Sequence, residues 1–109
     1  MIVLPPIPTR DDEKQDFLLE VAHIINNGSD RVSARSSGKR DDIPVNSCYL
    51  RYNDRYDEME FVIYAVGNLD EPVWRARLSS IGFAAFGSGF WLELEAASQP
   101  SVVLFEPSE

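Results

Sequence analysis

Apolar side chains recur at helical spacing near the start of the chain. They occupy the i, i+1, i+4, i+7 and i+8 positions that form one face of a helix, namely Phe17, Leu18, Val21, Ile24 and Ile25. Thr9 and the acidic residues at 11–13 are typical of an N-cap and a first helical turn. Asn27-Gly28 is typical of a helix C-terminus. We therefore predict a helix over residues 10–27 that packs its apolar face against a sheet.

The pattern changes to period two from Cys48 onward. Apolar and polar side chains alternate over 48–52, 59–66, 73–79 and 90–95, and the apolar residues 102–105 predict a short last strand. Asn53-Asp54-Arg55 supplies a turn between the first two segments, which predicts a hairpin. The fold class expected is α+β, with one N-terminal helix packed on an antiparallel sheet of about four to six strands in a two-layer sandwich.

The chain of 109 residues, 44% of them hydrophobic, suits one α+β domain over 1–109. Pro5, Pro6 and Pro8 exclude a helix over residues 1–8 and predict an extended apolar arm that packs on its own domain or on a neighbour. Val32 and Ala34 predict a short edge strand. The residues around 35–46 include a polar, apolar-free stretch and predict a mobile basic loop.

A segment rich in glycine and aromatic residues covers 81–91. Gly87-Ser88-Gly89 predicts a tight connection, because glycine adopts positive φ without strain. The aromatic side chains are expected in the core, and an exposed interaction patch is the alternative: Phe83, Phe86, Phe90 and Trp91.

Charge is the feature that most restricts function. The net charge of −8 repels phosphate backbones and anionic lipid, which argues against direct nucleic-acid binding and against membrane binding. It favours another protein with a basic surface as the partner. The acidic side chains expected to form the partner-binding surface lie on presumed strands and turns: Asp57, Glu58, Glu60, Asp70, Glu71, Glu93 and Glu95. Four basic residues offer the alternative of a phosphate contact: Arg31, Arg35, Lys39 and Arg40.

No catalytic residue is predicted. A Cys–His dyad requires hydrogen-bond contact, whereas His23 is expected on the solvent face of the helix and Cys48 on the core face of a strand. The carboxylates near residues 54–60 lack the ligand spacing and turn glycine of a calcium loop, so no metal is predicted. No cofactor is predicted either. With one cysteine, no leader pattern and no long apolar run, a cytoplasmic location is expected.

Two functional hypotheses follow from these features. The first is a small acidic protein-binding module, such as an inhibitor or an immunity or anti-defence protein, that docks a negative surface on a basic partner. The alternative is a structural subunit, for example of a viral particle, that self-assembles into a homo-oligomer through the N-terminal arm. The first treats the chain as a non-enzymatic binder of another protein, and the second treats it as a building block.

Overall fold

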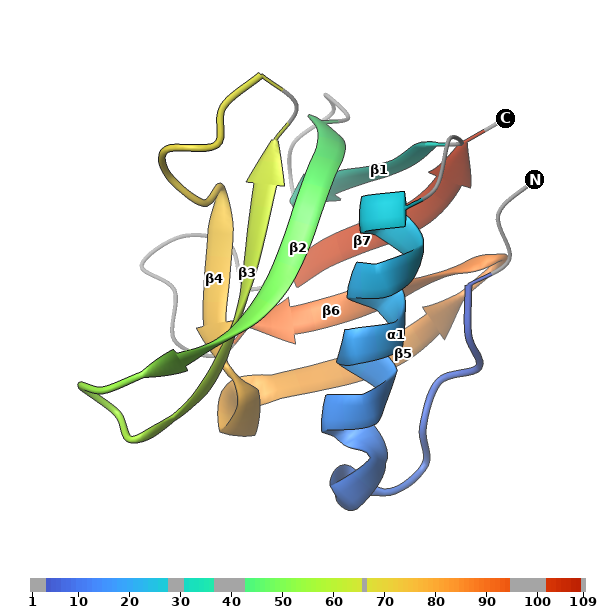
Figure 1. The fold of residues 1–109 in the computed structure, drawn as a ribbon. Coiled ribbons are helices and arrows are strands. Elements are labelled where there is room, and N and C mark those ends of the chain that lie inside the picture. The colour runs from blue at the N-terminus through green and yellow to red at the C-terminus, as the bar shows by residue number, and fades with distance from the viewer. Residues whose placement is uncertain (1–3, 28–30, 37–42, 66, 95–101, 109) are drawn as a thin grey trace.

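A computed structural model describes residues 4–27, 31–36, 43–65, 67–94 and 102–108 (Figure 1). A 3-10 turn, η1 (Asp11–Glu13), leads directly into the helix α1 (Lys14–Asn27). The strands are β1 (Arg31–Ser36), β2 (Ile43–Asn53), β3 (Glu58–Ala65), β4 (Trp74–Arg77), β5 (Ile81–Phe86), β6 (Gly89–Leu94) and β7 (Val102–Ser108). A second 3-10 turn, η2 (Leu78–Ser80), joins β4 to β5.

The strands pair in the order β4-β3-β2-β1-β7-β6-β5, and every pairing is antiparallel. β1 and β2 are joined by only two residue pairs, Ser33 with Pro44 and Ala34 with Ile43. Beyond this point β1 continues along β7, whereas β2 continues along β3. The sheet therefore opens into two parts, and α1 lies across the opening (Figure 1).

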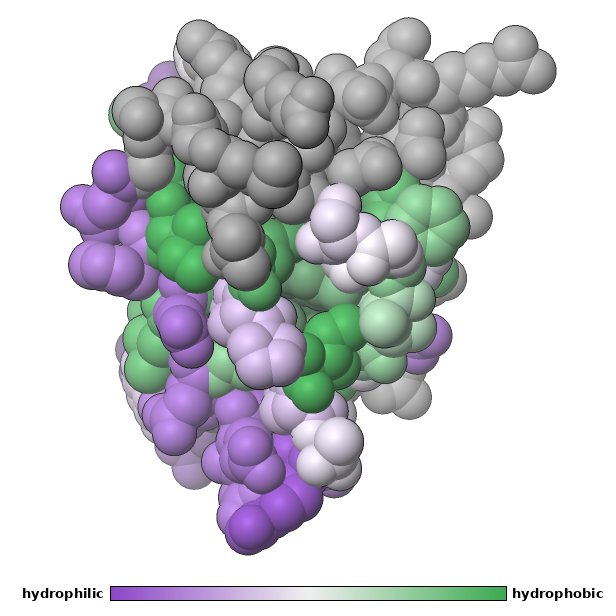
Figure 2. Space-filling model, turned by 90° about the vertical axis from the view of Figure 1, so that its right-hand side faces the viewer, coloured by the Kyte–Doolittle hydropathy of each residue, from purple (hydrophilic) through white to green (hydrophobic). Residues whose placement is uncertain are grey.

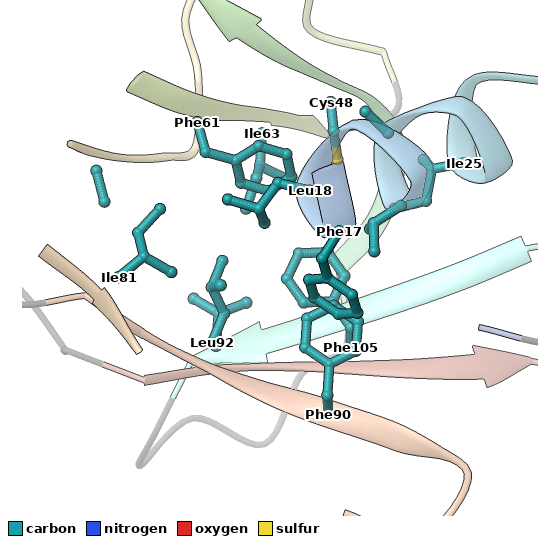
Figure 3. Close-up of a cluster of buried hydrophobic side chains, with 14 residues drawn as sticks. Phe17, Leu18, Ile25, Cys48, Phe61, Ile63, Ile81, Phe90, Leu92 and Phe105 are labelled. Carbon is teal, nitrogen blue, oxygen red and sulfur yellow. The ribbon is translucent and has the colours of Figure 1, made fainter. Parts of the chain in front are cut away.

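The core fills the space between α1 and both parts of the sheet (Figure 3). Phe17 meets the rings of Phe83 and Phe90 edge to face, with centroids 4.9 and 5.3 Å apart, and Phe90 stacks on Phe105 at 5.0 Å. Leu18 is fully buried. Full burial of such a side chain contributes about 1.5–3 kcal/mol, so the helix holds the two parts together mainly through its apolar face.

A pair of hydrogen bonds fixes the end of α1 to β2. The Nδ2 of Asn26 donates to the carbonyl oxygen of Cys48 at 2.8 Å, and the backbone N–H of Cys48 donates to the Oδ1 of Asn26, also at 2.8 Å. Cys48 pairs with Ile63 of β3, while β1 has already separated from β2. The amide of Asn26 thus satisfies two backbone groups that a neighbouring strand would otherwise pair.

The α+β class is confirmed, but the predicted sheet of four to six strands does not match the structure. Residues 81–86, taken for part of a connection, form the edge strand β5. β1 is an internal strand between β2 and β7, and the prediction of an edge strand there was wrong. The predicted helix is confirmed, although Arg10 rather than Thr9 occupies the N-cap of η1 and no side chain caps it.

The structure also changes the predictions for the basic loop, the N-terminal arm and the aromatic segment. β1 extends to Ser36 and β2 begins at Ile43, so the loop expected around 35–46 is strand at both ends, and 37–42 lie outside the described residues. Leu4 and Ile7 of the predicted arm pack on the core of their own domain. Phe90 is buried, whereas Phe86 is exposed, so the aromatic segment contributes to the core and to the surface.

Replacement of Asn26 tests the hydrogen-bond pair. Asn26→Ala leaves the N–H and the C=O of Cys48 without these partners, so the free energy of unfolding should fall by about 1–3 kcal/mol. Asn27→Ala is the control, because among the described residues its side chain bonds to His23 of its own helix and to no strand. It should change stability by less than about 0.5 kcal/mol. Urea unfolding followed by circular dichroism measures both, and equal losses would contradict the role of Asn26.

Candidate protein-binding surfaces

Glu60 of β3 is the most constrained of the predicted acidic residues. It is buried, and its Oε1 accepts hydrogen bonds from Arg75 of β4, at 2.8 Å from Nη2 and 3.3 Å from Nε. Its Oε2 accepts a hydrogen bond from the Nδ2 of Asn53 at 3.0 Å. Since both oxygens have partners within the domain, Glu60 does not present a free negative charge to a partner.

Its neighbours Glu58 and Asp57 are also engaged within the domain. The Oε1 of Glu58 accepts a hydrogen bond from the Oγ of Ser79 at 2.9 Å and lies 3.8 Å from the Nε of Arg77. Asp57 occupies the turn between β2 and β3 with a φ of 54°, and its Oδ1 accepts a hydrogen bond from the hydroxyl of Tyr52. Arginines across the strands therefore offset much of the negative charge expected here.

The remaining predicted acidic residues lie apart from this group. Asp70 and Glu71 are exposed in the connection from β3 to β4, at the other end of β3 from Asp57 (Figure 1). Glu93 is exposed on β6, beside Gly82 of β5, where an added Cβ would lie only 2.9 Å from the Oε2 of Glu93. Glu95 lies outside the described residues. The six predicted side chains that the structure describes thus do not gather on one surface.

The predicted basic contact is described only in part. Arg31 and Arg35 belong to β1, where they pair with Ser108 and Leu104 of β7. Lys39 and Arg40 lie outside the described residues. The described backbone therefore places two of the four basic residues on an internal strand instead of a free loop.

A different set of carboxylates lines a groove between the N-terminal segment and α1. Residues 5–9 form one wall, because three prolines keep the chain extended beside the helix. Phe17 of the core and Ile7, which packs against it, supply apolar surface. The other wall is acidic and comes from Glu13, Asp16 and Glu20. We call this feature the acidic groove; its volume is about 320 Å³.

The charged side chains that line the acidic groove are all negative. Glu13, Asp16 and Glu20 are all exposed, and none of the described residues that line the groove with them is basic. Glu13 lies 3.7 Å from the Nε of Arg10, an exposed ion pair of the kind that contributes little. Lys14 is directed elsewhere, since its Nζ donates to the carbonyl oxygen of Leu78 at 3.3 Å.

Figure 2 shows the side of the molecule on which the N-terminal segment lies. Hydrophilic residues extend along the left and lower parts of this face, next to hydrophobic residues nearer its centre. The sequence predicts the acidic residues at 11–13 only as part of a first helical turn. The i, i+3 and i+7 spacing of Glu13, Asp16 and Glu20 was the pattern that could have shown a common acidic face.

Cys48 and His23 do not meet. Cys48 is fully buried, and burial raises the pKa of its thiol far above the ordinary value. His23 is exposed on α1, where the Nδ2 of Asn27 lies 3.1 Å from its Nδ1. The expectation of a buried thiol and a surface imidazole is confirmed.

No family model, curated protein or solved structure matches this chain. Within the described ranges, no group of three or more His, Cys, Asp or Glu side chains is arranged to hold a metal ion. None of the helices in those same ranges is long and apolar enough to cross a membrane. Proposals about function therefore depend on the geometry of the surface.

The reactivity of the Cys48 thiol tests whether this side chain is buried in the folded protein. The thiolate is the reactive form, and burial disfavours it. At pH 8 the folded protein should react with an aromatic disulfide reagent at least a hundredfold more slowly than the protein in 6 M guanidinium chloride. Absorbance of the released thiolate measures both rates. Reaction of the folded protein at the rate of free cysteine would show that Cys48 is accessible.

Proposed function

We propose that this chain is a small acidic protein-binding module that receives a basic segment of a partner protein in the acidic groove. The observation that carries the proposal is the combination of three carboxylates with an apolar floor in one concave surface. Lysine and arginine match such a surface, because their aliphatic stems pack on apolar groups while their charged ends meet carboxylates. The proposed partner is thus still a protein with a basic surface, but its binding site on this chain is the acidic groove instead of the acidic residues predicted from the sequence.

The two walls of the groove would contact different parts of a basic side chain, one its aliphatic stem and the other its charged end. Ile7, Phe17 and the prolines would bury the stem of the guest side chain, which stabilises the complex by about 0.8 kcal/mol for each CH₂ group. Asp16 and Glu20 would pair with its charged end. The net charge of −8 would speed the approach of a basic partner and favour it over acidic ones.

Inhibition is the role that such binding serves most directly. A protein that covers the basic surface of a partner blocks any acidic substrate that uses the same surface. We therefore propose an inhibitor, immunity or anti-defence protein, acting without catalysis and in the cytoplasm. Direct binding of nucleic acid does not form part of this proposal.

A self-assembling subunit is the alternative, and one observation favours it. β5 is the last strand of the sheet and ends in the exposed Phe86, so its free edge offers a site for a strand of another copy. Light scattering after size exclusion distinguishes the two. We expect the mass of the monomer, 12.3 kDa, at low and at high salt; a discrete oligomer would favour self-assembly.

A charge-matched pair of variants tests the acidic groove. Glu13→Gln/Asp16→Asn/Glu20→Gln removes its three carboxylates, whereas Asp54→Asn/Asp70→Asn/Glu71→Gln removes three exposed carboxylates elsewhere. The probe is a labelled peptide of alternating arginine and leucine, followed by fluorescence anisotropy. The groove variant should bind at least tenfold more weakly than the unaltered chain, equivalent to about 1.4 kcal/mol.

The control variant should lose less than about threefold, because a non-specific effect of net charge is its only contribution. Binding by the unaltered chain should also weaken as salt rises from 0.05 to 0.5 M. Equal losses in the two variants would reduce the groove to an ordinary part of an acidic surface. The proposal would then be wrong at this position.

A further inference from the structure

We infer a second binding site of opposite charge, on the outer face of β3 and β4, that takes a carboxylate-bearing segment of a protein partner. A pocket of about 280 Å³ lies there between the two strands and the turn that joins β2 to β3. Three of its seven lining residues are arginines, and one is an acid: Asn53, Arg55, Tyr56, Glu60, Arg75, Ala76 and Arg77. We call it the arginine pocket.

The base of the arginine pocket is fixed before any ligand arrives. Arg75 is held by two hydrogen bonds to the Oε1 of the buried Glu60, whose Oε2 is held in turn by Asn53. This pairing directs Nε and Nη2 of Arg75 inward. Its side chain is nevertheless 58% exposed, so donors of the guanidinium remain open to a ligand.

The rim carries two further guanidinium groups on one aromatic ring. The Cζ of Arg77 lies 4.8 Å and that of Arg55 lies 5.7 Å from the centre of the Tyr56 ring. Each of the two guanidinium groups is thus attracted to the Tyr56 ring by a cation–π interaction. Arg77 is also 3.8 Å from Glu58, whereas Arg55 makes no ion pair with any residue that the structure describes.

Charge complementarity identifies the ligand. Glu60 offsets Arg75, and Glu58, which is outside the pocket lining, lies 3.8 Å from Arg77. Arg55 is therefore the lining guanidinium that no acid of the described residues pairs with, and Arg77 is shared with a half-buried carboxylate. Guanidinium groups bind carboxylates through paired hydrogen bonds, and arginine and tyrosine are the residues that most often dominate protein interfaces. A nucleic acid fits less well, because its phosphates would extend from the pocket over a chain of net charge −8.

The overall negative charge does not prevent this contact at physiological salt. The screening length there is about 8 Å, so acidic groups farther away contribute little. The charges that act on a ligand are those near the pocket, namely its three arginines together with Glu58 and Glu60. The arginine pocket does not depend on the acidic groove. Either site can exist without the other.

The test uses the full chain and a labelled hexaglutamate peptide at 0.15 M salt, with fluorescence anisotropy as the readout. Arg55→Gln/Arg77→Gln removes the rim and keeps the pair of Arg75 with Glu60. The control, Arg10→Gln/Lys14→Gln, removes the same charge elsewhere. We expect the rim variant to bind at least tenfold more weakly and the control to change less than threefold. Circular dichroism establishes that both variants are folded.

The inference is wrong if the unaltered chain does not bind hexaglutamate, or if the rim and control variants lose equal affinity. It is also wrong if an oligothymidine of equal charge binds more tightly than hexaglutamate and this binding depends on the pocket. If the double variant does not fold, an unchanged affinity in Arg55→Gln alone overturns the inference. The rim variant should still bind the arginine–leucine peptide, and the groove variant should still bind hexaglutamate. A failure of this inference is therefore distinguishable from a failure of the proposed function.

Discussion

The separation of β2 from β1 is the constraint on which the rest of the structure depends. After the pairs Ser33–Pro44 and Ala34–Ile43 the two strands diverge, which opens the sheet and leaves backbone groups of β2 without a strand partner. α1 fills the opening with its apolar face, and Asn26 near its end forms hydrogen bonds with the backbone of Cys48 in β2. A helix one turn shorter at its C-terminus would bury less apolar surface and would remove the two hydrogen bonds between Asn26 and Cys48.

The position of α1 then creates the two charged surfaces. Because one side of the helix is buried, its acidic residues lie on the other side, and the N-terminal segment returns beside them to form the acidic groove. The part of the sheet made of β2, β3 and β4 turns Phe61, Ile63 and Ala76 toward the helix. The residues between them alternate outward, which places Glu60, Arg75 and Arg77 on the opposite face.

Structure that is encoded locally could be predicted from the sequence, whereas structure that depends on pairing between distant segments could not. The periodicity of 17–25 predicts the helix because neighbours along one chain segment define its face. β5 was missed because Gly82, Ala84 and Ala85 are small and do not show clear alternation. The internal position of β1 depends on its six pairs with β7, some seventy residues away in the chain, and no local pattern reports that.

The same distinction applies to the acidic surface predicted around residues 57–71, which stays a prediction. A count of carboxylates over 57–71 omits the arginines that the register brings opposite them, and the pairing of β3 with β4 places Arg77 beside Glu60 and Arg75 beside Val62. Net charge acts over long distances, whereas a guest side chain responds to groups within about 8 Å at physiological salt. The choice of partner thus depends on the local arrangements of charges, which the net charge of −8 does not describe. For this chain they are a groove whose described lining is acidic and apolar and a pocket rich in arginine.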